Sequence, residues 1–206
     1  DRLRSRGLGD VYKRQDYSAY VNPFIGTGGH GHTFPGAVVP HGMIQPSPDT
    51  RIDGWDACSG YYYADSTING FSHTHVSGTG CCDYGDVLLM PTVGKQQYRT
   101  TDPQSQRLAY ASSFSHKNEI AEPGYYSVFL DTYQVKAEIS STKRGAIHRY
   151  TFPENTESGF IIDLDYSLQR QTNSEMEIEV ISDTEICGHK KTTYWAFDQY
   201  LSLIHI

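Results

Sequence analysis

Residues 53–80 hold the densest group of side chains that could do chemistry. The stretch carries Trp55 between Asp53 and Asp56, then the run Ser59-Gly-Tyr-Tyr-Tyr, and ends in Gly70-Phe-Ser-His-Thr-His-Val-Ser-Gly-Thr-Gly. A folding core would use Val, Leu and Ile at this density. Aromatic faces instead stack on the C–H faces of sugars, while carboxylate, imidazole and hydroxyl groups hydrogen-bond to sugar hydroxyls. The composition of this stretch therefore predicts a carbohydrate site.

The two tryptophans have different sequence contexts. Trp55 lies among turn-forming residues, where an indole flanked by Asp53 and Asp56 suits a sugar-stacking platform; the alternative is an indole packed over one end of the domain. Trp195 lies in a strand-like pattern, so we expect it in the core.

Paired carboxylates are the usual signature of a glycosidase, with one as acid and one as base or nucleophile. The candidate pairs are Asp53/Asp56, Asp83/Asp86 and Asp163/Asp165. The last pair shares one face of an expected strand and is expected to be solvated. Nothing in the sequence singles out a pair as catalytic, so none is assigned.

Two pairs of histidines could bind a metal or a ligand. His30 and His32 lie in the glycine-rich loop Gly26-Thr-Gly-Gly-His-Gly-His, either as metal ligands or as hydrogen-bonded loop residues. The loop lacks the lysine and the strand-to-helix context of a phosphate loop. His73 and His75 share a face if that segment is extended. Metal binding would require further ligands; hydrogen bonding to a substrate or a neighbouring domain, or a structural role, are the alternatives, and no metal ligand is assigned.

Strand signals dominate the chain. Prolines 23, 35, 40, 46 and 48 exclude long helices near the N-terminus. Short strands are expected there, for example at 60–64. After residue 86, alternating segments such as Tyr133–Ser140 follow at regular spacing, and Asp183-Thr184 is expected to turn a hairpin. We predict an all-β fold, a large antiparallel β-sandwich with long Gly/Pro-rich loops and little helix.

Composition narrows the possible partners. The 206 residues suit one β-sandwich domain, and the net charge of −7 argues against nucleic acid, which requires a basic face. No apolar run reaches the roughly 18 residues of a membrane span. The cysteines are expected to be free thiols, with a bridge from Cys58 to Cys81 or Cys82 as the alternative.

Both ends of the chain look foreign to the fold. Residues 1–15 are rich in basic residues and lack the apolar core of a secretory signal, and residues 201–206 follow a strand-like segment abruptly. Both resemble translated adapter sequence, so we expect a non-native extension (1–15), a domain over 16–200 that is incomplete at its C-terminus, and a non-native tail (201–206). A genuine basic arm and final strand are the alternative.

Several long motifs, in order, resemble the N-terminal domain of glycoside hydrolase family 92. They are Tyr20-Val-Asn-Pro-Phe-Ile-Gly-Thr-Gly, Phe34-Pro-Gly-Ala-Val-Val-Pro-His-Gly-Met, Gln45-Pro-Ser-Pro-Asp-Thr, Gly54-Trp-Asp, Ser59-Gly-Tyr-Tyr-Tyr, Gly70-Phe-Ser-His-Thr-His-Val-Ser-Gly-Thr-Gly, Asp83-Tyr-Gly-Asp-Val-Leu-Leu-Met-Pro and Phe114-Ser-His-Lys-Asn-Glu-Ile-Ala-Glu-Pro-Gly-Tyr-Tyr. The resemblance covers residues 16–200.

The resemblance implies a calcium-dependent, inverting exo-α-mannosidase, often specific for α-1,2 linkages, that pairs this sandwich with an (α/α)6 barrel. The general acid, the general base and most calcium ligands would lie on that barrel, which this chain lacks, so the chain alone is expected to be inactive. Mannose-containing glycans and the chain's own barrel are the implied partners. The implied location is secreted or periplasmic.

The resemblance also implies which residues touch substrate. Trp55 would form a wall near the leaving-group sugar, with Arg51, Asp53, Gly54 and Cys58 nearby and His73 and His75 beside it. The alternatives are a free-standing carbohydrate-binding module and an interdomain interaction module.

Overall fold

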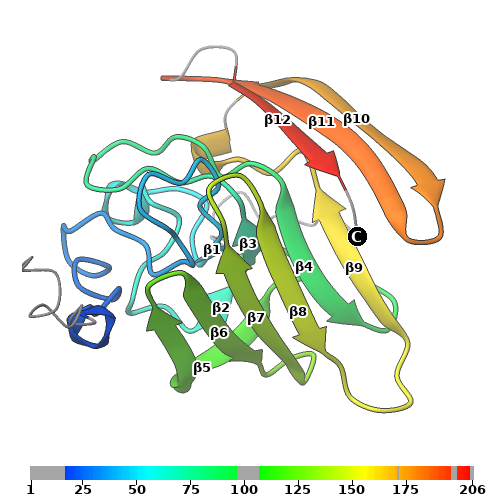
Figure 1. Cartoon of the computed structure of the whole chain (residues 1–206), viewed down its shortest axis with the longest axis horizontal. Helices are drawn as coiled ribbons and strands as arrows, with labels where there is room; N and C mark the ends of the chain where they lie inside the picture. Colours follow the sequence, from blue (N-terminus) through cyan, green and yellow to red (C-terminus); the bar gives the residue numbers. More distant parts are fainter. Residues whose placement is uncertain (1–16, 97–106, 171, 196–198, 205–206) are drawn as a thin grey trace, which may run out of the picture.

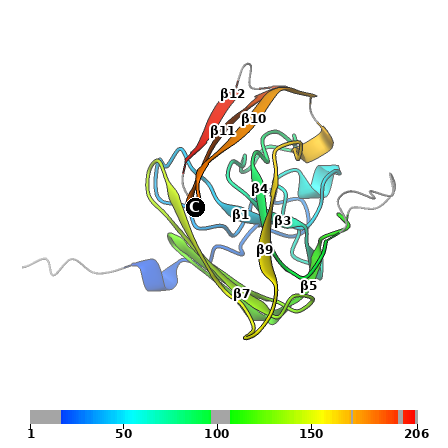
Figure 2. The ribbon, with the colours of Figure 1, turned by 90° about the vertical axis from the view of Figure 1, so that its right-hand side faces the viewer.

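The computed structural model describes residues 17–96, 107–170, 172–195 and 199–204. Two antiparallel sheets form a sandwich, and a third sheet lies across one end of it (Figure 1, Figure 2). The five-stranded sheet has the order β2 (Thr67–Ile68), β5 (Ser112–Glu122), β6 (Tyr125–Leu130), β7 (Val135–Ser141) and β8 (Ala146–Thr151). The four-stranded sheet has the order β1 (Ser47–Asp49), β3 (Gly70–Ser72), β4 (Leu88–Val93) and β9 (Ser158–Asp163).

The third sheet contains β10 (Thr172–Ser182), β11 (Glu185–Thr193) and β12 (Gln199–Ile204). In the described part of the chain, helix is limited to the short 3-10 turns η2 (Ser18–Tyr20), η3 (Trp55–Ala57) and η4 (Leu168–Arg170). The predicted all-β sandwich with little helix is therefore confirmed. None of the helices described here is long and apolar enough to cross a membrane.

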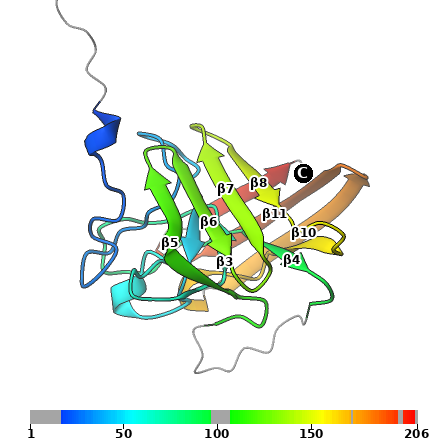
Figure 3. The same cartoon turned by 90° about the horizontal axis from the view of Figure 1, so that it is seen from below.

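Alternation along β7 builds the core. Val135, Ala137 and Ile139 are at most 1% exposed, and Phe71 from β3 meets Tyr126 from β6 edge-on at 6.4 Å between ring centroids. Burying a side chain of this size contributes about 1.5–3 kcal/mol. The core thus lies between the two larger sheets, which Figure 3 shows from below.

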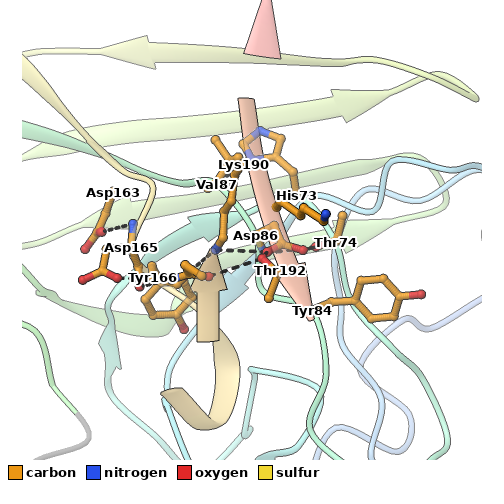
Figure 4. A network of polar contacts seen from close by, with 12 residues as sticks. His73, Thr74, Tyr84, Asp86, Val87, Asp163, Asp165, Tyr166, Lys190 and Thr192 are labelled. Carbon is orange, nitrogen blue, oxygen red and sulfur yellow. Dashed lines mark hydrogen bonds and ion pairs between the residues drawn. The ribbon is translucent and has the colours of Figure 1, made fainter. Parts of the chain in front are cut away.

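A buried ion pair fastens the third sheet to the sandwich. Lys190 of β11 is 0% exposed, and its ammonium lies 3.0 Å from Asp86, which precedes β4. The same ammonium donates to the carbonyl of Tyr166. Thr192 donates to Asp86 at 2.6 Å and Thr74 donates to its other oxygen at 3.0 Å (Figure 4). Each Asp86 oxygen therefore has a donor, as a buried charge requires.

Three local predictions are corrected. The segment 60–64 forms bends and turns instead of a strand, and a positive φ of 85° at Gly60 interrupts it. Trp195 is 70% exposed in the bend that follows β11, not in the core. Of the pair expected to be solvated, Asp165 is exposed beyond the end of β9, but Asp163 is buried, where its carboxylate accepts a 2.6 Å hydrogen bond from the buried Tyr110 hydroxyl.

The expected hairpin turn at 183–184 is confirmed between β10 and β11. The backbone at 201–204 continues β12 and pairs with β11, and the domain bounds expected from sequence stay a prediction. Residues 1–15 and 205–206, the rest of the expected non-native ends, lie outside the described residues.

Candidate functional site

Trp55 stands at the start of η3 and is 55% exposed. Gly54 before it has φ +112°, a conformation that only glycine adopts readily. The Asp53 carboxylate accepts a 2.7 Å hydrogen bond from the Gly54 amide, and the Ala57 amide closes the turn by donating to the Gly54 carbonyl at 3.2 Å. Behind the turn, the thiols of Cys58 and Cys82 are directed at the carbonyls of Thr79 and Gly54, respectively. A fixed turn therefore presents a large aromatic surface to solvent.

The glycine-rich loop lies against Trp55. The His32 ring meets the indole edge-on at 4.4 Å between centroids, and the His30 ring lies 5.0 Å away at a tilt. His30 Nδ1 is 2.5 Å from Asp56 Oδ1. Gly80 leaves room on another side, since a Cβ there would fall 2.5 Å from the indole nitrogen. Trp55, Asp56 and the loop histidines therefore form one cluster.

Arg51 is held on the same chain segment by its neighbours. It donates two 2.8 Å hydrogen bonds to the Asp65 carboxylate, and its guanidinium lies 4.2 Å from the Tyr62 ring centroid. The side chain remains 31% exposed. Such a fork is fixed in orientation and can still offer its outer N–H groups to hydroxyls.

His73 and His75 lie inside the domain. β3 ends at Ser72, and beyond it the two rings enter separate networks instead of one shared face. His75 contacts Asp49 at 2.8 Å and the Gln45 carbonyl at 2.7 Å, with its side chain 0% exposed. His73 contacts the Val87 carbonyl at 2.7 Å. Their assignment as substrate contacts stays a prediction, and these contacts support the structural alternative.

The described residues provide no ready metal centre. No group of three or more His, Cys, Asp or Glu side chains in this part of the chain is arranged to hold a metal ion. Asp86 is committed to Lys190, and Asp56 faces His30. These residues alone do not fit a calcium site, which takes six to eight oxygen ligands.

All four cysteines are free thiols, as expected, and the alternative, a disulfide from Cys58 to Cys81 or Cys82, is not formed. Burial raises the pKa of the Cys58 thiol, and raises that of Cys82 to about 12. Both thiols therefore stay protonated and act as packing groups beneath the Trp55 turn.

The sandwich presents an exposed tryptophan beside a carboxylate and two imidazoles, a combination of aromatic face and polar groups that suits contact with sugars. The chain belongs to glycosyl hydrolase family 92: residues 20–203 match the family model of the glycosyl hydrolase family 92 N-terminal domain. The predicted resemblance is confirmed.

The chain is similar to known glycosidases in both sequence and structure. The chain is 32% identical over 157 residues to an uncharacterized secreted glycosidase of Arthroderma benhamiae, covering 75% of this chain and 19% of that protein. The family GH92 α-mannosidase BT3965 of Bacteroides thetaiotaomicron, solved in complex with mannoimidazole, is 40% identical and superposes with a TM-score of 0.84, covering 92% of this chain and 25% of that one. The family GH92 inverting mannosidase BT2199 of the same species is 31% identical with a TM-score of 0.68, covering 86% and 23%.

The chain therefore spans about a quarter of the length of these solved relatives. The structure places Asp53, Gly54, Trp55 and Cys58 together with Asp56, which was expected to flank the indole, and adds His30 and His32, which were not assigned to this surface from sequence. The sequence signal that could have linked the two segments is the glycine-rich loop with two histidines that lies 23 to 25 residues before Trp55.

Proposed function

We propose that this chain is the substrate-binding N-terminal domain of a secreted exo-α-mannosidase that removes terminal mannose from glycans with inversion, with α-1,2 linkages as substrates. The observation that carries the proposal is the family match over residues 20–203 together with the exposed Trp55 surface. The Bacteroides relatives are mannosidases, one of them inverting, and the Arthroderma relative is a secreted glycosidase.

In this proposal, Trp55 stacks on the leaving-group sugar. Arg51 and Asp53 orient hydroxyls around it, and Gly54 and Cys58 shape the turn that carries the indole. Such contacts lower the barrier by holding the scissile bond in position, because correct positioning can replace much of the entropy cost of reaction. His73 and His75 would support this surface from inside the domain.

The general acid and base belong to the rest of the full-length protein, proposed to be an (α/α)6 barrel. Inversion requires two carboxyl groups about 6.5–9.5 Å apart, with room for a water. Calcium would bind mainly to that other domain, where it would contact sugar hydroxyls. The chain alone would then bind weakly and release no mannose.

Exposed apolar side chains support a missing domain partner. Tyr20, Val21 and Ile25 near the N-terminus and Val180 on β10 are 54–79% exposed. Tyr20, Val21 and Ile25 are neighbours in the sequence, whereas Val180 lies separately on the third sheet, and exposed apolar surface at either place can mark an interaction site. We propose that the barrel covers part of it.

Complementation tests the proposal. The chain would be co-expressed with a family 92 mannosidase from which the N-terminal domain has been deleted, and mannose release from α-1,2-mannobiose would be measured. We expect activity only when both parts are present, and a loss of about tenfold or more with Trp55→Ala. A folded complex without activity would count against the proposal.

A free-standing carbohydrate-binding module is the second candidate, favoured by the exposure of Trp55. It predicts measurable binding of mannobiose by the isolated chain in calorimetry, abolished by Trp55→Ala. Equal binding by the variant would exclude stacking on Trp55.

A further inference from the structure

His30 and Asp56 form an exposed pair beside Trp55. The side chains are 72% and 39% exposed, and Nδ1 of His30 lies 2.5 Å from Oδ1 of Asp56. The same imidazole lies 5.0 Å from the indole. Two polar groups and one aromatic face therefore share one surface.

The contact fixes how the imidazole can act. A carboxylate only accepts hydrogen bonds, so Nδ1 carries the proton and donates it to Asp56. The ring then presents Nε2 as its remaining hydrogen-bonding atom, and the exposure of His30 leaves Nε2 accessible. Asp56 thus sets both the tautomer and the orientation of His30.

A structural role explains the pair poorly. The loop is held by other bonds: Gly78 N donates to the His32 carbonyl at 2.6 Å, and Thr33 N donates to the Gly26 carbonyl at 3.3 Å. Gly31 packs so closely on Gly26 that a Cβ would fall 2.2 Å from its carbonyl oxygen. An exposed ion pair adds only about 0–1 kcal/mol. A ligand is the better reason for an ordered pair at this position.

We infer that His30 is a specificity-determining residue whose Nε2 hydrogen-bonds a hydroxyl of the leaving-group sugar stacked on Trp55, and that Asp56 is its positioning residue. This inference rests on the proposed function. It predicts that His30 distinguishes a disaccharide, which has such a hydroxyl, from an aryl mannoside, which lacks one.

The test compares two substrates on the full-length enzyme. We expect His30→Ala to lower kcat/KM about fivefold to tenfold for α-1,2-mannobiose, the size of one hydrogen bond, and less than twofold for 4-nitrophenyl α-mannoside. Asp56→Ala should match it, Asp56→Asn should keep part of the activity because an amide oxygen also accepts, and the double variant His30→Ala/Asp56→Ala should be no worse than His30→Ala. His41→Ala, at another exposed loop histidine, is the control.

Each outcome of this test either supports or overturns the role inferred for His30. Equal losses on both substrates, or no loss with mannobiose, would overturn the inference. If wild type binds mannobiose by tryptophan fluorescence but releases no mannose, the proposed function fails and the dissociation constant of His30→Ala still tests the inference: an unchanged value rejects it. If wild type neither binds nor cleaves, both are wrong. Unchanged thermal unfolding of the variants excludes misfolding.

Discussion

His73 and His148 join the two sheets of the sandwich through a 3.1 Å contact between their Nε2 atoms. His73 follows β3, and His148 lies in β8 of the opposite sheet. His73 donates from Nδ1 to the Val87 carbonyl, so its Nε2 accepts the proton of His148 Nε2. His148 Nδ1 then accepts from the Tyr150 hydroxyl at 2.8 Å. The contact between the two Nε2 atoms is lost when both rings are protonated, because each Nε2 then carries a hydrogen.

This pair should make the domain sensitive to acid. Burial lowers the pKa of His73 and lowers that of His148 well below its ordinary value. In the unfolded chain both titrate near 6.5, so below that pH the unfolded state binds more protons and the free energy of unfolding falls. We expect a loss of up to about 1.4 kcal/mol per pH unit for each ring. Urea unfolding at pH 7.5, 6.5 and 5.5 measures it.

The control for that experiment is His148→Gln, which keeps a donor and an acceptor but cannot titrate. Its dependence on pH should be shallower than that of wild type. Identical slopes would show that acid acts elsewhere in the domain.

The elements that were predictable from sequence depend on neighbours in the chain. Alternation across Tyr133–Ser140 and the turn at 183–184 follow from local geometry and side-chain period, and both are present. The contact of His30 with Asp56 joins residues 26 positions apart, and that of Thr192 with Asp86 joins residues 106 apart. Such contacts depend on how the sheets pack, which no local pattern encodes. For the same reason, the exposure of Trp195 was not predictable from its strand-like surroundings.

The buried ion pair of Lys190 and Asp86 should be costly to break. Lys190→Met leaves the Asp86 carboxylate buried with only the hydroxyls of Thr74 and Thr192, so we expect a loss of about 3–5 kcal/mol in urea unfolding. Lys191→Met is the matched control, because its pair with Glu175 at 3.5 Å is partly exposed and should cost less than about 1 kcal/mol. Asp86→Asn/Lys190→Met should recover part of the loss. Similar values for Lys190→Met and Lys191→Met would contradict this role.

Gly80 should set the position of the Trp55 indole. A methyl group at residue 80 would fall 2.5 Å from the indole nitrogen, so Gly80→Ala must displace the ring. The ring is 55% exposed and can rotate, so the cost in stability should stay below about 1 kcal/mol. Acrylamide quenching in a Trp195→Phe background reports Trp55 alone and should change. Gly159→Ala, with its nearest contact at an ordinary 3.7 Å, should leave quenching as it was, and an unchanged Gly80→Ala would show that the indole is positioned otherwise.

The four cysteine thiols should react with a thiol reagent at different rates. Cys187 is exposed on β11, whereas Cys58 and Cys82 are buried, and burial raises the pKa of both, to about 12 for Cys82. Because the thiolate is the reactive form, Ellman's reagent at pH 8 should modify Cys187 first and the two buried thiols only on unfolding. Burial also raises the pKa of Cys81, which is partly exposed and should react at an intermediate rate. Cys187→Ser should remove the fast phase and leave the slow ones. Fast modification of Cys58 or Cys82 in the folded chain would mean that the Trp55 turn opens readily, and the fixed aromatic surface on which the carbohydrate site depends would then not exist in solution.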